Sequence, residues 1–339
     1  MPPINACTVN FVPTSTNPSC EKKSIEELLR PGKKSVIHMS YRDFNCLRKI
    51  GSGSFGKVYS AVLLHHRNLS ALNNVVAVKE LVRRKGTSQL QFREDFLREA
   101  QMMTELNGHE NVVKLFAVVD DNPNYHLVME LCDQGSLERM LRVHGNSLQT
   151  EKRIEFAIQA ARGLEWLHSK GIIHRDLAAR NCLIAGGTLK LADFGMSRTM
   201  ENCMINVNLP LNVRWMAPEL WVTGTVSFAT DIFSFGILLW ELFAIPSARP
   251  YGCIRAREVR ARVMDGYRMD IPESMPLSIA HLLQLCWHGT PSVRPTAAYI
   301  QQELTRILSK YEYDPFSCAK VFYELHKCQA RYAPNEEER

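Results

Sequence analysis

Several reactive side chains lie together between positions 174 and 181, where the sequence reads HRDLAARN. Asp176 provides a carboxylate that can orient a hydroxyl group or accept its proton, and Asn181 provides an amide oxygen that can bind a metal ion. Arg175 and Arg180 add positive charge, which suits the binding of phosphate oxygens. A further carboxylate follows at Asp193. Phosphoryl transfer to a hydroxyl group needs this combination.

A glycine-rich stretch, GSGSFGKV at 51–58, lies upstream. Glycines let main-chain amides approach phosphate oxygens without a Cβ clash. The same spacing occurs in dinucleotide-binding folds, but there a helix follows the glycines. Here the sequence from Lys57 to Leu63 has the β-branched and aromatic composition of a strand. This favours a phosphate-binding loop between two strands.

A lysine and a glutamate with complementary roles follow the glycine-rich stretch. Lys79 ends the apolar run VAVK, and Glu99 lies in a helical pattern. Glu94 and Asp95 are competing partners for the lysine if helix spacing alone is considered. These features, the HRD-x4-N spacing and the DFG triplet at Asp193 together resemble the protein kinases, and in particular their tyrosine-specific group. Alignment with that family selects Glu99.

The resemblance implies an α+β, bilobal protein-kinase fold. A small N-lobe would hold an antiparallel sheet and one main helix, and a larger, mainly helical C-lobe would follow. The expected boundaries are a flexible N-terminal segment at 1–40, a catalytic domain at 41–310 and a tail at 311–339. Within the domain we expect the N-lobe at 41–130, the hinge at 130–135 and the C-lobe at 136–310.

The resemblance also implies the roles of individual residues. Asp176 and Arg180 would act at the acceptor hydroxyl, Lys79 held by Glu99 would bind the α- and β-phosphates, and the metal ligands would be Asn181 and Asp193. The expected cofactors are ATP and Mg²⁺, with Mn²⁺ able to substitute. The residues implied to contact ATP are Ile50, Gly51, Ser52, Gly53, Ser54, Phe55, Gly56, Lys57, Val58, Ala77, Lys79, Met129, Glu130, Cys132 and Leu183, with backbone contacts at Glu130 and Cys132.

Further residues resemble the scaffold of the family. Asp231 would anchor the backbone of the catalytic loop, and Glu219 and Arg294 would form an ion pair in the larger lobe. An internal hydrophobic stack is implied as well, although its members are also ordinary core residues. They are Met103, Leu115, His174 and Phe194.

Three features resemble kinases that act on tyrosine rather than on serine or threonine. Ala178 stands two residues after Asp176, where the serine/threonine group has lysine, and Arg180 follows four residues after the aspartate. The sequences VRWMAPE at 213–219 and LCW at 285–287 also match the tyrosine group. The resemblance therefore implies protein substrates with tyrosine acceptors.

The chain departs from the family at several positions. No tyrosine lies between Asp193 and Glu219, so we expect that phosphorylation of a loop tyrosine does not switch the enzyme on. Asn212 stands where the family commonly has proline, which affects the expected peptide preference. Phe233 replaces a usual tryptophan, and Ala297 replaces a common phenylalanine.

Hydrophobic patterning predicts the secondary structure around these motifs. Helices are expected at 92–106, at 154–168 and, as a buried core helix, at 232–245. Strands are expected at 44–50, 58–64, 75–81, 112–119 and 125–131.

Composition limits the remaining possibilities. The 339 residues carry a net charge of +6, and the basic residues are spread along the chain, so nucleic-acid binding is not predicted. The ten cysteines lack metal-site spacing and indicate a reducing compartment. We find no apolar run of the roughly 18 residues that a membrane span requires. We therefore expect a cytoplasmic, non-receptor enzyme. Two alternatives stay open: a pseudokinase scaffold, and a dual-specificity or serine/threonine kinase.

Overall fold

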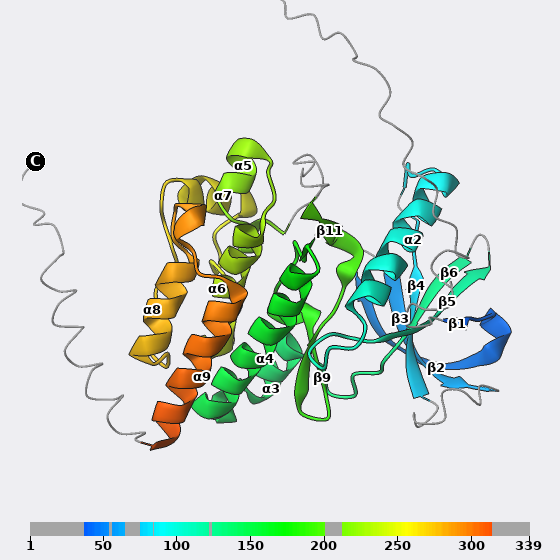
Figure 1. Cartoon of the computed structure of the whole chain (residues 1–339), viewed down its shortest axis with the longest axis horizontal. Coiled ribbons are helices and arrows are strands. Elements are labelled where there is room, and N and C mark those ends of the chain that lie inside the picture. Colours follow the sequence, from blue (N-terminus) through cyan, green and yellow to red (C-terminus); the bar gives the residue numbers. More distant parts are fainter. Residues whose placement is uncertain are drawn as a thin grey trace, which may run out of the picture.

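The structure is a computed structural model that describes residues 37–53, 56–64, 75–83, 85–121, 124–200 and 212–313. Figure 1 shows a sheet-rich lobe beside a larger helical lobe, which confirms the predicted α+β, two-lobed arrangement. The N-terminal segment before residue 37 and the tail beyond residue 313 lie outside the described residues, as do Ser54 and Phe55.

The smaller lobe is built on a six-stranded sheet with the order β1-β5-β6-β4-β3-β2. Every neighbouring pair is antiparallel, as predicted, except that the two-residue β1 runs parallel to β5. The strands are β1 (Ile37–His38), β2 (Phe44–Gly53), β3 (Gly56–Leu63), β4 (Val75–Leu81), β5 (Leu115–Asp121) and β6 (Asn124–Met129).

The two faces of this sheet have different surroundings because side chains alternate along a strand. On β4, Val76 and Val78 are fully buried in a small hydrophobic cluster on one face. Ala77 and Lys79 point to the opposite face, where they line the cleft between the lobes. The alternation of side-chain directions along β4 therefore turns Lys79 toward the cleft.

Helix caps make two helices begin earlier than predicted. Helix α2 (Gln89–Leu106) begins three residues before the expected start because the Ser88 hydroxyl accepts a hydrogen bond from Gln91 N at 3.1 Å. Helix α6 (Phe228–Phe243) is preceded by a capping box at Ser227 and begins four residues before its expected start. Local side-chain capping thus sets boundaries that the apolar pattern leaves open.

The prediction of a strand at 112–119 was wrong at its start. β5 begins at Leu115, because the residues just before it pair with the larger lobe. Val112 forms a β-bridge with Leu191, and Val113 N donates to Leu191 O at 2.9 Å. The strand predicted at 125–131 ends at Met129, where the chain enters the hinge. Apolar patterning cannot distinguish these connections from a continuous strand.

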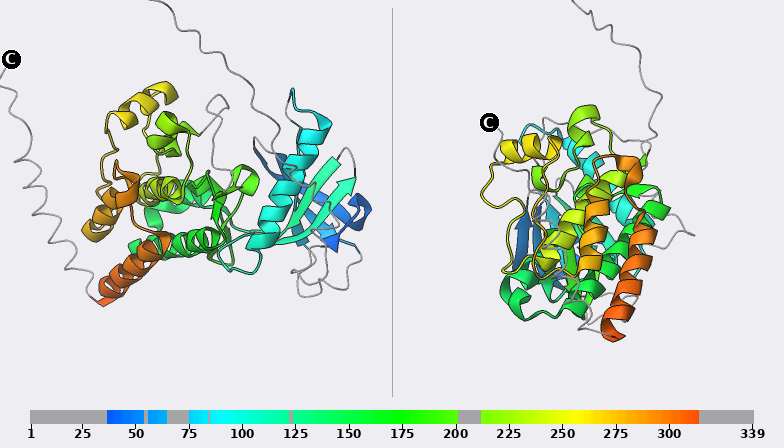
Figure 2. Two further views of the ribbon diagram at one scale, coloured as in Figure 1. Left: turned by 45° about the horizontal axis from the view of Figure 1, so that its top comes forward. Right: turned by 90° about the vertical axis from the view of Figure 1, so that its left-hand side faces the viewer.

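The larger lobe surrounds α6, in which thirteen of sixteen residues are buried. Figure 2 shows the helices of this lobe from two further directions. Its helices are α3 (Leu137–His144), α4 (Thr150–Ser169), α5 (Glu219–Thr223), α6, α7 (Ala256–Met264), α8 (Leu277–Cys286) and α9 (Ala297–Tyr313). Its short strands are β7 (Gly135–Ser136), β8 (Ile172–Ile173), β9 (Cys182–Ala185), β10 (Thr188–Leu191) and β11 (Arg198–Thr199).

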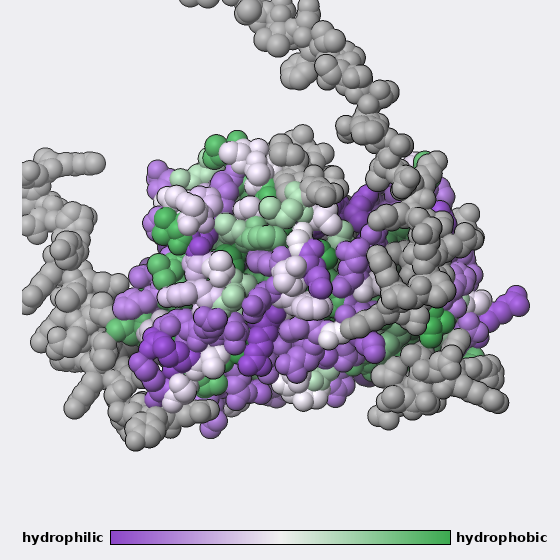
Figure 3. Space-filling view, in the orientation of Figure 1, coloured by the Kyte–Doolittle hydropathy of each residue, from purple (hydrophilic) through white to green (hydrophobic). Residues whose placement is uncertain are grey.

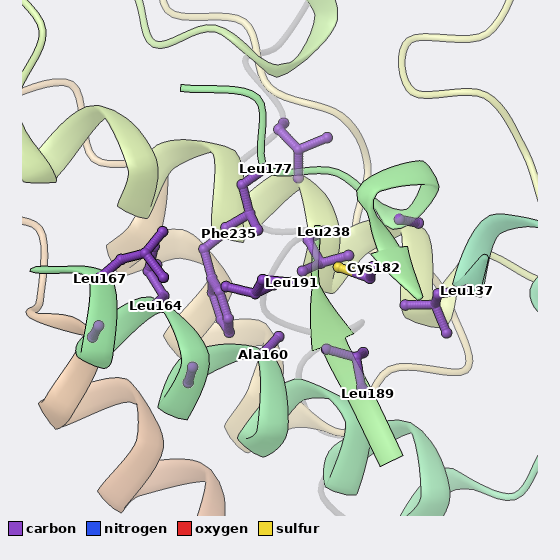
Figure 4. Packing of buried hydrophobic residues seen from close by; sticks show 14 of the residues in the cluster. Leu137, Ala160, Leu164, Leu167, Leu177, Cys182, Leu189, Leu191, Phe235 and Leu238 are labelled. Atoms are coloured by element: carbon purple, nitrogen blue, oxygen red, sulfur yellow. The ribbon is translucent and has the colours of Figure 1, made fainter. Parts of the chain in front are cut away.

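The segment 174–181 is fastened to the core of this lobe. Figure 4 shows Leu177 directed into a cluster with Phe235 and Leu238 of α6 and Leu191 of β10. Helix α4 comes close to this layer at Gly163, where a Cβ atom would lie only 2.7 Å from the carbonyl oxygen of Asn111. Close packing therefore fixes the backbone that carries the reactive side chains.

Hydrophilic side chains predominate over α4 and α9 on the face seen in Figure 3. Among the described residues, no helix combines the length and the apolar character that crossing a bilayer requires.

Candidate active site

A cleft of about 1350 Å³ lies between the two lobes. The ATP-contact residues predicted from the resemblance that line it are Ile50, Gly51, Ser52, Gly56, Val58, Ala77, Lys79, Met129, Glu130, Cys132 and Leu183. Lys57 points elsewhere, with its ammonium 4.0 Å from Glu80 Oε1. The glycine-rich stretch joins β2 and β3, so a phosphate-binding loop between strands fits the sequence prediction.

On the hinge side of the cleft, the side chains of the two residues predicted to contact ATP through their backbone are paired or buried. The carboxylate of Glu130 pairs with Lys190 Nζ at 3.0 Å. The Cys132 thiol is buried, and burial raises its pKa to about 12, so it stays protonated near neutral pH. These side chains leave the recognition of a planar base to main-chain groups.

Lys79 joins both lobes through two ion pairs. Its Nζ lies 2.6 Å from Glu99 Oε1 of α2 and 2.9 Å from Asp193 Oδ1 of the larger lobe. Burial alone would lower the pKa of Lys79, but attraction to the two carboxylates outweighs burial and raises this pKa. The alternative partner Asp95 instead binds Arg98 at 2.7 Å. The lysine is therefore a fixed cation facing the cleft.

Asp193 is held as an anion at the same point. Burial opposes its ionisation, but Lys79 outweighs burial and keeps the Asp193 pKa below its ordinary value. Burial has the larger effect on Glu99, whose pKa is raised despite the same lysine. The backbone at Asp193 has a φ of 64°, in the left-handed region that non-glycine residues rarely adopt. Such strain is common where a side chain must be aimed at a ligand.

Three donors surround the Asp176 carboxylate. Its Oδ1 accepts hydrogen bonds from the Arg180 guanidinium and from Asn212 Nδ2, the latter at 2.7 Å. Its Oδ2 accepts from Asn181 Nδ2 at 2.8 Å. A carboxylate has about four lone-pair positions, so one acceptor position on Oδ2 is left for a hydroxyl group. The Asn212 contact was not predicted, although this position was identified as unusual.

The donor set suits a hard divalent cation. Because Nδ2 of Asn181 donates to both Asp176 O and Asp176 Oδ2, its Oδ1 is free to act as a ligand. Asp193 contributes carboxylate oxygens nearby. Among the described residues no group of three or more His, Cys, Asp or Glu side chains could enclose a metal. Mg²⁺ is commonly held by one or two protein oxygens together with substrate phosphates, which matches this arrangement.

Two buried carboxylates of α6 position the loop that carries Asp176. Asp231, a predicted anchor, accepts hydrogen bonds from His174 N at 2.8 Å and Arg175 N at 2.9 Å. Glu241 accepts from Ala179 N at 3.0 Å, and burial raises the Glu241 pKa to about 7. Sequence reasoning missed the role of Glu241, although a glutamate within an apolar helix was the available signal.

A tryptophan links Glu241 to the acceptor side of the loop. Trp215 Nε1 donates to Glu241 Oε2 at 3.0 Å, and the guanidinium carbon of Arg180 lies 4.1 Å from the centre of the Trp215 ring. Arg180 in turn binds Asp176. This chain of contacts fixes the orientation of both charged groups.

The predicted scaffold residues also lie in contact. The two terminal guanidinium nitrogens of Arg294 donate to Glu219, at 2.6 and 2.8 Å. The rings of His174 and Phe194 are 5.4 Å apart, and Met103 and Leu115 are buried in the same region. The structure therefore brings together residues that are widely separated in the sequence.

Comparison with known proteins agrees with this geometry. Residues 44–304 match the family described as protein tyrosine and serine/threonine kinase. The chain belongs to this protein kinase family. The match covers most of the chain, so the fold and the two-lobed cleft are those of a protein kinase catalytic domain.

Similar curated proteins are tyrosine kinases or receptors. The chain is 36% identical over 294 residues to the tyrosine-protein kinase transforming protein Fps of Fujinami sarcoma virus, covering 86% of this chain and 32% of that protein. Human tyrosine-protein kinase Fer is 35% identical over 295 residues, covering 85% and 34%. A fibroblast growth factor receptor of Halocynthia roretzi is 31% identical over 327 residues, covering 87% and 42%. This kinase chain thus spans less than half of each of these relatives.

Proposed function

We propose that this kinase transfers the γ-phosphate of ATP to tyrosine hydroxyl groups of protein substrates. One observation carries the proposal: Lys79 is paired with Glu99 and Asp193 while Asp176 and Asn181 lie in the same cleft. All five groups that phosphoryl transfer requires are present and oriented toward one space. A scaffold without catalytic function has no need to maintain this arrangement.

Each group has a distinct part in the proposed reaction. Lys79 would bind phosphate oxygens of the nucleotide, and Asn181 and Asp193 would hold Mg²⁺, which supplies positive charge to the phosphates when bound. Asp176 would orient the acceptor hydroxyl through the open position on Oδ2 and accept its proton. Arg180 keeps the carboxylate in place and adds positive charge beside the transferred group.

Tyrosine as the acceptor is supported by the loop sequence and by its contacts. Ala178 stands two residues after Asp176, where the serine/threonine group has lysine. Arg180, placed against Trp215, provides the cation from further along the loop. The tyrosine kinases among the similar proteins point the same way.

One observation favours the dual-specificity or serine/threonine alternative. Asn212 places a polar amide against Asp176, at a position where tyrosine kinases commonly have proline. A polar group here suits a small aliphatic hydroxyl as well as a phenol. The predicted cytoplasmic location and domain boundaries stay predictions.

Phosphoamino-acid analysis tests the proposed function. The kinase is incubated with labelled ATP, Mg²⁺ and matched peptides whose acceptor is tyrosine, serine or threonine. We expect phosphotyrosine alone. Comparable phosphoserine or phosphothreonine would establish the alternative specificity, and magnesium-dependent stabilisation by ATP without any transfer would support the scaffold.

A further inference from the structure

Five exposed arginines lie close together on and just before α7. They form what we call the arginine surface, and only one acidic residue, Glu258, interrupts the stretch 249–262 that contains them. The prediction that the basic residues are spread along the chain did not include this local concentration. The arginine surface consists of Arg249, Arg255, Arg257, Arg260 and Arg262.

Most of this charge has no carboxylate partner among the residues that the structure describes. Arg255 donates from Nε to Glu258 Oε1 at 2.9 Å. None of the other four arginines has a carboxylate within 4.0 Å among the described residues. Val259 and Val263 are buried, so the helical period turns Arg257 and Arg260 away from the core. The arginine surface is thus available to an anionic partner.

The arginine surface is fastened to the acceptor side of the active site. Buried Arg214 donates to Pro250 O at 2.7 Å and to Ile254 O, which lie in the turn leading into α7. Burial and the nearby charge of Arg249 lower the pKa of Arg214. Two residues before Arg214, Asn212 contacts Asp176. The turn leading into α7 is therefore connected through the short segment 212–214 to the carboxylate that would receive the acceptor tyrosine.

We infer that the arginine surface is a docking site for an acidic segment of the protein substrate, outside the acceptor tyrosine itself. This inference rests on the proposed function and names a substrate class for it. Guanidinium groups form paired hydrogen bonds with carboxylates, so glutamate- or aspartate-rich segments are suitable ligands. Such a contact raises substrate affinity and association rate without entering the chemical step.

A protein segment fits this surface better than a nucleic acid or a membrane does. Glu258 lies among the arginines, and the exposed Asp265 and Asp270 follow them in the sequence. A continuous row of phosphates would meet these carboxylates as well as the arginines. A peptide can place its acidic side chains on the arginines alone.

The test compares peptides that share one acceptor sequence. One is minimal, one adds about six glutamates through a flexible Gly/Ser spacer, and one adds glutamines instead. We expect the wild type to show a KM for the glutamate peptide roughly fivefold below that of the other two, with an unchanged kcat. In the double variant Arg257→Gln/Arg260→Gln the advantage disappears, while kinetics on the minimal peptide stay as in the wild type. The KM advantage of the glutamate peptide should also decrease in about 0.5 M salt, because salt screens exposed charges.

A matched double variant, Arg83→Gln/Arg142→Gln, removes two exposed arginines from other parts of the chain and should keep the KM advantage of the glutamate peptide. Fluorescence anisotropy of the labelled glutamate peptide gives a second readout that needs no catalysis. Failure of all peptides to be phosphorylated would count against the proposed function, whereas anisotropy would still decide the docking site. Equal KM and equal binding for all peptides overturns the inference. So does a variant that loses only its binding to RNA or phosphatidylserine vesicles.

Discussion

Replacing Glu241 with glutamine is expected to change how the stability of the kinase depends on pH. Glu241 is buried in α6, and its Oε2 accepts hydrogen bonds from Ala179 N and Trp215 Nε1, each at 3.0 Å. A glutamine can accept both bonds through its carbonyl oxygen and cannot ionise. The substitution therefore keeps the geometry and removes the titration.

The size of the effect follows from the pKa of Glu241. Burial raises this pKa from an ordinary value of 4.5 to about 7. The contribution of Glu241 to the unfolding free energy is complete below the pKa that Glu241 has in the unfolded chain. It is lost as pH rises through the higher pKa of the folded protein, because Glu241 ionises first in the unfolded chain. At 1.36 kcal/mol per pKa unit, the wild type loses about 3 kcal/mol of unfolding free energy from this group across that window. The glutamine variant does not.

Urea unfolding at several pH values measures this difference. Relative to the wild type, Glu241→Gln should gain about 2 to 3 kcal/mol of unfolding free energy between roughly pH 5 and pH 8. Glu94→Gln, on the exposed side of α2, is the control and should show no such trend. A difference that is constant with pH, or that shrinks as pH rises, would refute the reasoning.

Three further substitutions test other parts of the structure. Glu219→Ala leaves buried Arg294 without its carboxylate and should lower the unfolding free energy by about 3–5 kcal/mol, measured by urea unfolding; a loss under about 1 kcal/mol would contradict the ion-pair role. Lys79→Met should abolish the magnesium-dependent rise in Tm with ATP, and an unchanged rise would exclude Lys79 from nucleotide binding. Asn212→Pro removes one hydrogen-bond donor from Asp176 and should lower KM for a tyrosine peptide about fivefold. This factor corresponds to one hydrogen bond of about 1 kcal/mol. A raised KM would show that the Asn212 amide assists binding of the acceptor.

The sequence was sufficient for those features that depend on local pattern. The strand predicted at 75–81 matches β4, and its Lys79 lines the cleft. The motif residues Asp176, Asn181 and Asp193 were identified by spacing, and they lie at the same cleft. Spacing succeeds here because each residue is held by the backbone of its own short segment.

Features that depend on distant contacts were not predictable in the same way. Asn212 and Asp176 are 36 positions apart, and only the folded chain brings the amide to the carboxylate. Glu241 acquires its raised pKa from burial against two other segments. β5 begins late because Val113 pairs with Leu191, 78 positions further along the chain. In each case a tertiary contact overrides what the local sequence indicates.

Single-turnover phosphorylation of a tyrosine peptide by Asp176→Asn tests most directly whether Asp176 receives the acceptor proton. Asparagine keeps the shape of the side chain, and ATP affinity measured by calorimetry provides the control. We expect the transfer rate to fall about 10²- to 10⁴-fold, with the ATP Kd changed by less than about threefold. A transfer rate equal to that of the wild type, with ATP bound normally, would contradict the assignment of Asp176 as the base for the acceptor hydroxyl.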